Sequence, residues 1–118
     1  MAEERLRYVV LRHDGVADPH YDLMFETSPG SSLATWRSGE WPPRPGTPLI
    51  HLNDHRAAYL SYEGKVSGHR GFVRRVNSGF HTVIDDGPEL LRVRLENNTV
   101  LTLYRGPPSA ADVHPAGA

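Results

Sequence analysis

Cysteine is absent from the sequence, which excludes disulfide bonds and thiolate metal sites and fits a protein of the cell interior. Neither sign of charge is in excess: 13 Lys+Arg stand against 14 Asp+Glu, so any site for a polyanion has to be a local patch. No apolar run reaches the ~20 residues of a membrane-spanning helix, and residues 1–5 lack the apolar core of a signal peptide. We therefore expect a cytoplasmic protein that does not bind membranes.

Glycine and proline are abundant instead, with 11 and 10 residues in a chain of 118, and they indicate many turns and little long helix. Apolar and polar residues alternate with a period of two in at least four segments. These features predict a mainly β fold, a compact antiparallel β-barrel or sandwich with few short helices. We expect one domain over residues 1–105, followed by a flexible Pro/Ala/Gly-rich tail over residues 106–118.

Turn-forming residues divide the domain into short segments. Strands are expected at residues 6–12, 20–26, 33–37, 49–55, 71–76, 80–85, 91–96 and 99–105. The tripeptide Asn77-Ser78-Gly79 predicts a hairpin turn between two of them. Residues 38–48 are expected to be a loop, and residues 56–62 a short strand or one helical turn. Three histidines, His51, His69 and His81, are expected on the surface.

The strongest chemical signal is His20 and Asp22 in the second strand. Successive side chains of a strand alternate between its two faces, so these two lie side by side. His13 ends the preceding strand, and the turn after it can bring its imidazole back to them. Two imidazoles and one carboxylate suit Zn²⁺, Mn²⁺ or Fe²⁺, and they leave coordination positions open for catalysis. A solvated polar strand face is the alternative.

Several short motifs resemble, in their order, the 3′-phosphoesterase domain of bacterial DNA ligase D, which also exists as a stand-alone protein. The resemblance covers about residues 7–105. It is carried by His13-Asp14, His20-Tyr21-Asp22-Leu23, Glu26, Trp36, Asp54-His55, Tyr59 and Tyr62-Glu63-Gly64.

This resemblance implies a β-barrel or sandwich with a manganese-dependent site that trims 3′ ends of DNA. The implied reaction removes a 3′-phosphate or a terminal ribonucleotide, with repair ligase or polymerase proteins as partners. The implied metal ligands are His13, His20 and Asp22, for Mn²⁺ or another divalent ion such as Zn²⁺. The implied catalytic residues are His55, which contacts the phosphate and protonates the leaving oxygen, and Tyr59, which donates a hydrogen bond to the phosphate.

The chain departs from the family pattern at four places where the family carries a charged residue: it has Met24, Glu40, Asn53 and, where an arginine precedes the Asp-His motif, Thr47-Pro48. The family has an arginine two residues after the ligand aspartate, and such a side chain binds phosphate with two parallel hydrogen bonds. We therefore expect slow turnover, which Met24→Arg should raise if the neighbouring strand leaves room. Arg70, Arg74 and Arg75 form either a replacement phosphate patch or a solvated face.

Two other functions stay open. The protein is alternatively a catalytically weak relative that binds metal and a DNA end, or a repair partner, without turnover. A non-haem iron oxygenase is the further alternative, because His20, Asp22 and His55 also match a set of two histidines and one carboxylate.

Overall fold

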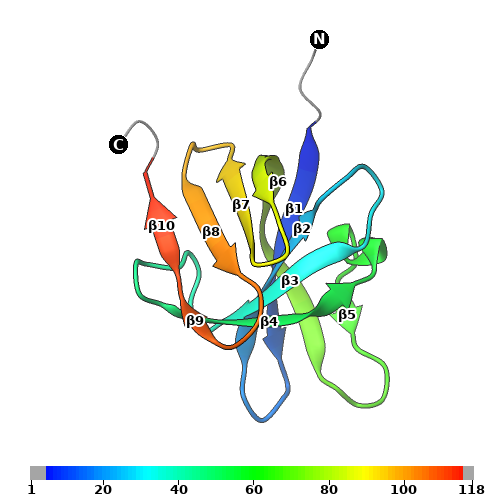
Figure 1. The fold of residues 1–118 in the computed structure, drawn as a ribbon. Helices are drawn as coiled ribbons and strands as arrows, with labels where there is room; N and C mark the ends of the chain where they lie inside the picture. The colour runs from blue at the N-terminus through cyan, green and yellow to red at the C-terminus, as the bar shows by residue number, and fades with distance from the viewer. Residues whose placement is uncertain (1–4, 116–118) are drawn as a thin grey trace.

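The computed structural model describes residues 5–115, which form an antiparallel sheet curled into a nearly closed barrel (Figure 1). Its strands are β1 (Leu6–Asp14), β2 (His20–Glu26), β3 (Leu33–Ser38), β4 (Pro48–His55), β5 (Gly64–Lys65), β6 (Phe72–Asp86), β7 (Leu90–Leu95), β8 (Val100–Tyr104), β9 (Ser109–Ala110) and β10 (Asp112–His114). A single turn of 3-10 helix, η1 (Ala57–Leu60), follows β4. The prediction of a mainly β barrel with few short helices is confirmed. Within residues 5–115, no helix has the length and apolar character needed to cross a membrane.

The strand order is β10-β8-β7-β6-β1-β2-β3-β4-β9, with β5 paired to β6. The two outermost strands are consecutive in the chain and are separated only by Ala111. Strand β9 pairs with β4 and β10 pairs with β8, so this short segment links the two edges of the sheet. Ala111 is buried, and its N–H donates to the carbonyl of Thr47 at 2.7 Å. The expected tail is thus wrong for residues 109–114, because unpaired barrel edges offer backbone partners that composition cannot reveal.

The expected hairpin turn at Asn77-Ser78-Gly79 is also wrong, since β6 runs without interruption through it. All nine residues of β1 pair with β6, and an irregularity between Val10 and Leu11 absorbs one extra residue of β6. Gly79 has a packing role, because a Cβ there would lie 3.2 Å from the Tyr8 ring and would collide with the Glu96 carboxylate. That carboxylate accepts the Phe80 N–H at 2.8 Å.

Side chains of β1, β2 and β3 are buried on both faces of the sheet. One face forms the inner core of the barrel, with Val10, Leu23, Phe25 and Trp36 among its members. The other face carries an outer cluster, which consists of Val9, Leu11, Met24, Leu33, Leu60 and Val73. A buried side chain of this size contributes roughly 1.5–3 kcal/mol, and a slip of one residue would exchange the two faces. Burial on both faces therefore fixes the register of β1, β2 and β3. It also fixes the face on which each side chain at the end of the outer cluster lies.

Candidate metal centre and adjoining pocket

His13, His20 and Asp22 meet where the outer cluster ends. His13 on β1 is the cross-strand neighbour of His20 on β2, and the two ring centroids are 5.0 Å apart. Asp22 follows on the same face: its Oδ1 lies 3.4 Å from His20 Nε2, and its Oδ2 lies 3.7 Å from His13 Nδ1. One potential ligand atom from each residue falls within 4.8 Å of the others. Strand alternation and the turn after His13 thus bring the three residues together as expected, while metal binding stays a prediction.

Backbone carbonyls determine which imidazole nitrogens face Asp22. His20 Nδ1 lies 2.7 Å from the carbonyl oxygen of Asp18, and His13 Nε2 lies 2.6 Å from that of Arg70. A carbonyl only accepts, so each of these nitrogens carries the proton and donates. In neutral rings, the lone pairs of His20 Nε2 and His13 Nδ1 then point toward the carboxylate. Metal-binding histidines are oriented by outer hydrogen bonds of this kind.

The donor atoms fit a divalent cation. His20 and Asp22 are only 5% and 4% exposed, and within residues 5–115 neither His20 Nε2 nor Asp22 Oδ1 has a hydrogen-bond partner. Two lone pairs and a buried carboxylate without a donor between them are unfavourable, because burial removes water without replacing its hydrogen bonds. A bound cation would satisfy all three groups at once.

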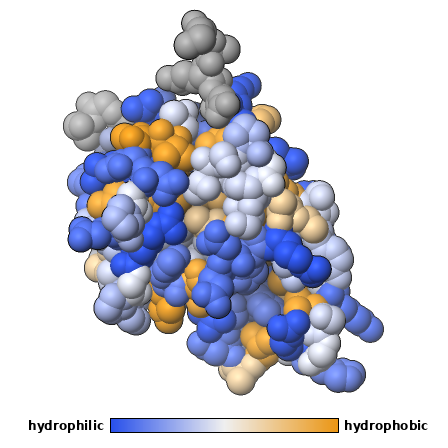
Figure 2. All heavy atoms as spheres, turned by 45° about the vertical axis from the view of Figure 1, so that its right-hand side comes forward, coloured by the Kyte–Doolittle hydropathy of each residue, from blue (hydrophilic) through white to orange (hydrophobic). Residues whose placement is uncertain are grey.

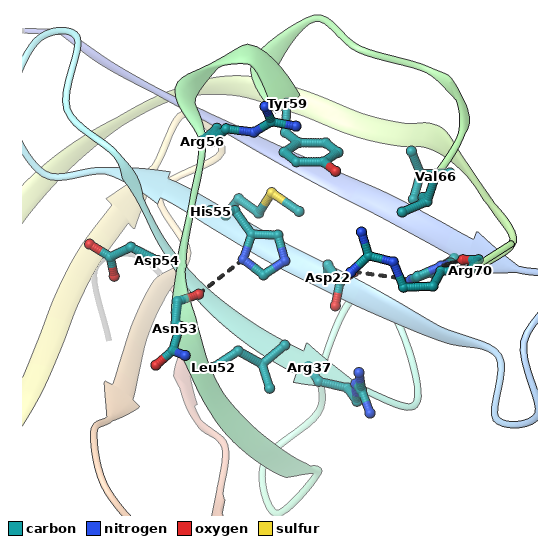
Figure 3. Close-up of a pocket in the computed structure, with 13 residues that line it drawn as sticks. Asp22, Arg37, Leu52, Asn53, Asp54, His55, Arg56, Tyr59, Val66 and Arg70 are labelled. Carbon is teal, nitrogen blue, oxygen red and sulfur yellow. Dashed lines mark hydrogen bonds and ion pairs between the residues drawn. The ribbon is translucent and has the colours of Figure 1, made fainter. Parts of the chain in front are cut away.

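The cluster borders a pocket of about 550 Å³, shown in Figure 3. His55, at the end of β4, and Tyr59, on η1, line its wall with ring centroids 5.8 Å apart. His55 Nδ1 lies 3.0 Å from the carbonyl oxygen of Asn53 and therefore donates to it, which leaves Nε2 for the pocket. Asp54 points away from the His55 side of the strand (Figure 3), and its carboxylate accepts the Ser32 hydroxyl at 2.9 Å.

The pocket also contains the arginines Arg37, Arg56 and Arg70. None of them forms an ion pair within residues 5–115, whereas Arg12, Arg44, Arg75 and Arg105 each have a carboxylate partner. The sequence pattern indicated Arg70 as part of a possible phosphate patch, but it did not indicate Arg37 or Arg56. Alternation with the buried Trp36 places Arg37 on the opposite face of its strand. Only the pairing of β3 with β2 shows that this face is the one that carries Asp22, and a local sequence pattern does not contain that pairing.

The three residues Met24, Glu40 and Asn53, which replace charged residues of the family pattern, do not all lie at the pocket. Asn53 lines the pocket, and so does Met24, which belongs to the outer cluster and is only 1% exposed. Glu40 does not line this pocket and pairs with Arg44 at 3.1 Å. Hydrogen bonds from Thr47 and Arg44 lower the pKa of Glu40. Its negative charge is thus neutralised locally.

The expectation of surface histidines is wrong for His81, which is 3% exposed. His51 is half-buried against the Trp36 ring, with centroids 4.8 Å apart. Neither residue lines the pocket beside the cluster. Both therefore belong to the packing of the barrel.

Figure 2 turns the right-hand side of Figure 1, where η1 and β5 lie, toward the viewer. This face is mainly hydrophilic, and its apolar residues are scattered over it. It suits a polar ligand better than an apolar one. Comparison with protein-family models gave no match, and comparison with curated proteins gave none either.

Proposed function

We propose that the protein is a divalent-metal-dependent phosphoesterase, with Mn²⁺ as the preferred ion, that acts on 3′ ends of nucleic acids. Its substrate would be a DNA or RNA-terminated DNA end, from which it removes a 3′-phosphate or a terminal ribonucleotide. One observation carries the proposal: two imidazole lone pairs and a buried carboxylate converge beside a pocket lined by arginines that have no carboxylate partner among the described residues.

His13, His20 and Asp22 would hold the metal. When bound, a divalent ion polarises a phosphoryl oxygen and lowers the pKa of a coordinated water. Arg37, Arg56 and Arg70 would bind the phosphate oxygens, because guanidinium groups pair with phosphate through short, charge-assisted hydrogen bonds. These three arginines would supply the positive charge that is missing because Met24 stands where the family has an arginine.

His55 and Tyr59 would act on the reacting phosphate. In the hydrolysis, a water oxygen forms a bond to phosphorus while the bond from phosphorus to the 3′ oxygen breaks. His55 protonated at Nε2 would donate its proton to that leaving oxygen, since Nδ1 is already bonded to the Asn53 carbonyl. The Tyr59 hydroxyl would donate a hydrogen bond to a phosphate oxygen. The product is a 3′-hydroxyl, which a repair ligase or polymerase in the cytoplasm requires.

The test measures phosphate release from a 3′-phosphorylated oligonucleotide during titration with Mn²⁺, with Zn²⁺ and without metal. Release that depends on Mn²⁺ and is lost in Asp22→Ala is expected. Oxidation of a substrate with Fe²⁺ and 2-oxoglutarate, without phosphate release, would favour the oxygenase alternative. The oxygenase alternative requires His55 as the third metal ligand. In the described residues, however, the histidine whose nitrogen lies close to His20 and Asp22 is His13.

The second candidate is a protein that binds DNA ends without turnover. It is favoured by one observation, the apolar side chain of Met24 in the lining of the pocket. This candidate requires affinity for a 3′-phosphorylated end at about 50 mM salt that weakens steeply as salt increases. It replaces the enzyme proposal if such binding is measured and no metal stimulates release.

A further inference from the structure

A second hollow, of about 220 Å³, adjoins the pocket that contains His55. The two cavities share three lining residues, Arg56, Tyr59 and Val66. Beyond this shared wall, the second hollow is lined by Tyr62 and Lys65 and by the small residues Ala58 and Ser67. The two hollows are therefore direct neighbours on the protein surface.

Tyr62 presents an exposed aromatic ring whose orientation is fixed. The side chain is 40% exposed, and its hydroxyl donates to the carbonyl oxygen of Lys65. The rings of Tyr59 and Tyr62 pack edge to face, with an interplanar angle of 89° and centroids 5.8 Å apart. Gly64, at φ +137°, passes so close that a Cβ would lie 3.1 Å from the Tyr62 hydroxyl. An exposed aromatic ring held in place is a platform on which a nucleic-acid base can stack.

The charge at this hollow is positive. Lys65, the only lysine of the sequence, is exposed, and neither it nor Arg56 forms an ion pair within residues 5–115. The nearest acid along the chain, Glu63, is already engaged: it accepts the Arg75 N–H at 2.9 Å, and its carboxylate lies 3.8 Å from the Arg75 guanidinium. The two cations are thus available to a phosphodiester.

We propose that this second hollow binds the nucleotide that precedes the 3′ end, with its base on Tyr62 and its phosphodiester beside Lys65 and Arg56. The inference rests on the proposed function for the placement of the 3′ end in the first pocket. It narrows the substrate class to oligonucleotides, because a free nucleotide or a small phosphate ester would leave the second hollow empty. A single strand or a frayed end fits best, since a base stacked on a side chain is not stacked in a duplex.

The first experiment measures binding of 3′-phosphorylated deoxynucleotides of one, two and four residues by fluorescence anisotropy in EDTA, so that no turnover intervenes. Affinity is expected to rise from one to two residues. Tyr62→Ala should weaken binding of the longer ligands about 5- to 150-fold, the loss of one base stack, and Tyr62→Phe should retain most of the affinity. Tyr104→Ala is the matched control, because Tyr104 is an exposed tyrosine on β8 outside both hollows.

The second experiment uses the single lysine as a probe. Acetylation of Lys65 by an amine-selective reagent is followed by mass spectrometry, with the α-amino group of the chain as internal reference. The tetranucleotide should slow acetylation of Lys65 relative to the reference, and the mononucleotide should not.

The outcomes separate this inference from the proposed reaction. Equal affinity for one and four residues, or unprotected Lys65 in the tetranucleotide complex, would overturn the second hollow as a nucleotide site even if phosphate release is observed. Length-dependent binding that is lost in Tyr62→Ala would support it even if no metal stimulates release, in which case only the reaction fails.

Discussion

Arg37 on β3 stands directly opposite Asp22 on β2, and Arg37 Nε is buried and has no hydrogen-bond partner in the part of the chain that the structure describes. Directly opposed residues of an antiparallel pair project to the same face, so Arg37 shares the sheet face of the candidate metal ligands. Figure 3 shows both side chains at the same pocket. A buried donor without a partner is unfavourable. Because Arg37 also lines the pocket, its guanidinium is placed to pair with a phosphate bound there.

Arg37→Ala should therefore lower the rate of Mn²⁺-stimulated phosphate release by about 100- to 1000-fold, the effect of removing one donor to a reacting oxyanion. Arg37→Lys should recover only part of the rate, because an ammonium cannot form two parallel bonds. The exposed Arg94 does not line the pocket, so Arg94→Ala serves as control. Equal rates in Arg37→Ala and wild type would assign the phosphate to other cations.

Asp22→Asn should abolish Mn²⁺ binding measured by isothermal titration calorimetry, because an amide keeps the shape of the carboxylate but loses its charge. His13→Ala and His20→Ala should weaken Mn²⁺ binding strongly. His69 lies outside the cluster and provides the matched control, His69→Ala. Undiminished binding in Asp22→Asn would show that the ion sits elsewhere.

His55→Ala should abolish phosphate release while leaving Mn²⁺ affinity unchanged, since His55 is not among the grouped ligand atoms. Tyr59→Phe should reduce release less, because it removes a single hydrogen bond worth about 1 kcal/mol, or roughly fivefold. Calorimetry and rate measurements on the same preparations separate the two roles. Parallel loss of metal affinity in His55→Ala would instead make this histidine a ligand.

Met24→Arg is now expected to destabilise the fold, which revises the prediction of faster turnover made from the sequence. Met24 packs in the outer cluster beside Val9 and Leu11 and is 1% exposed, so an arginine there would have to displace this packing before its guanidinium reached the pocket. Overpacking of a core typically costs about 1–3 kcal/mol in the free energy of unfolding, and a buried charge adds to this. Urea denaturation would measure the loss. A variant as stable as wild type and faster in phosphate release would restore the original expectation.

His81 should make stability fall on mild acidification. Burial lowers the pKa of His81, while its hydrogen bond to the Glu26 carbonyl, at 2.8 Å, partly opposes this. As pH falls below about 6.5, the unfolded chain binds a proton that the folded chain does not, so the free energy of unfolding decreases, by up to about 1.4 kcal/mol per pH unit. In His81→Gln this dependence is absent.

The stability difference between wild type and His81→Gln should therefore shrink from pH 7.5 to pH 5.5 in urea denaturation. The pKa of His51 is also lowered, by burial and by Arg105, but His51 is present in both proteins and its effect cancels. A difference that stays constant with pH would show that His81 takes up its proton equally in both states.

Local sequence patterns determined much of this protein. Alternation placed His20 and Asp22 on one face of a strand, because successive residues of an extended backbone point to opposite sides. The closing hairpin of β7 and β8 was equally predictable, since its two strands are adjacent in the chain and Asn97-Asn98 turns between them. The mainly β class followed from the same period of two.

Only the tertiary structure decided which strands lie side by side. Pairing with β1 makes β6 continuous through Asn77-Ser78-Gly79. Residues 109–114 join the sheet because they pair with the edges of β4 and β8. The same long-range register brought Arg37 opposite Asp22 and buried His81. A side chain's face depends on its own backbone, whereas its neighbours depend on contacts between residues far apart in the chain, and a local pattern contains no information about those.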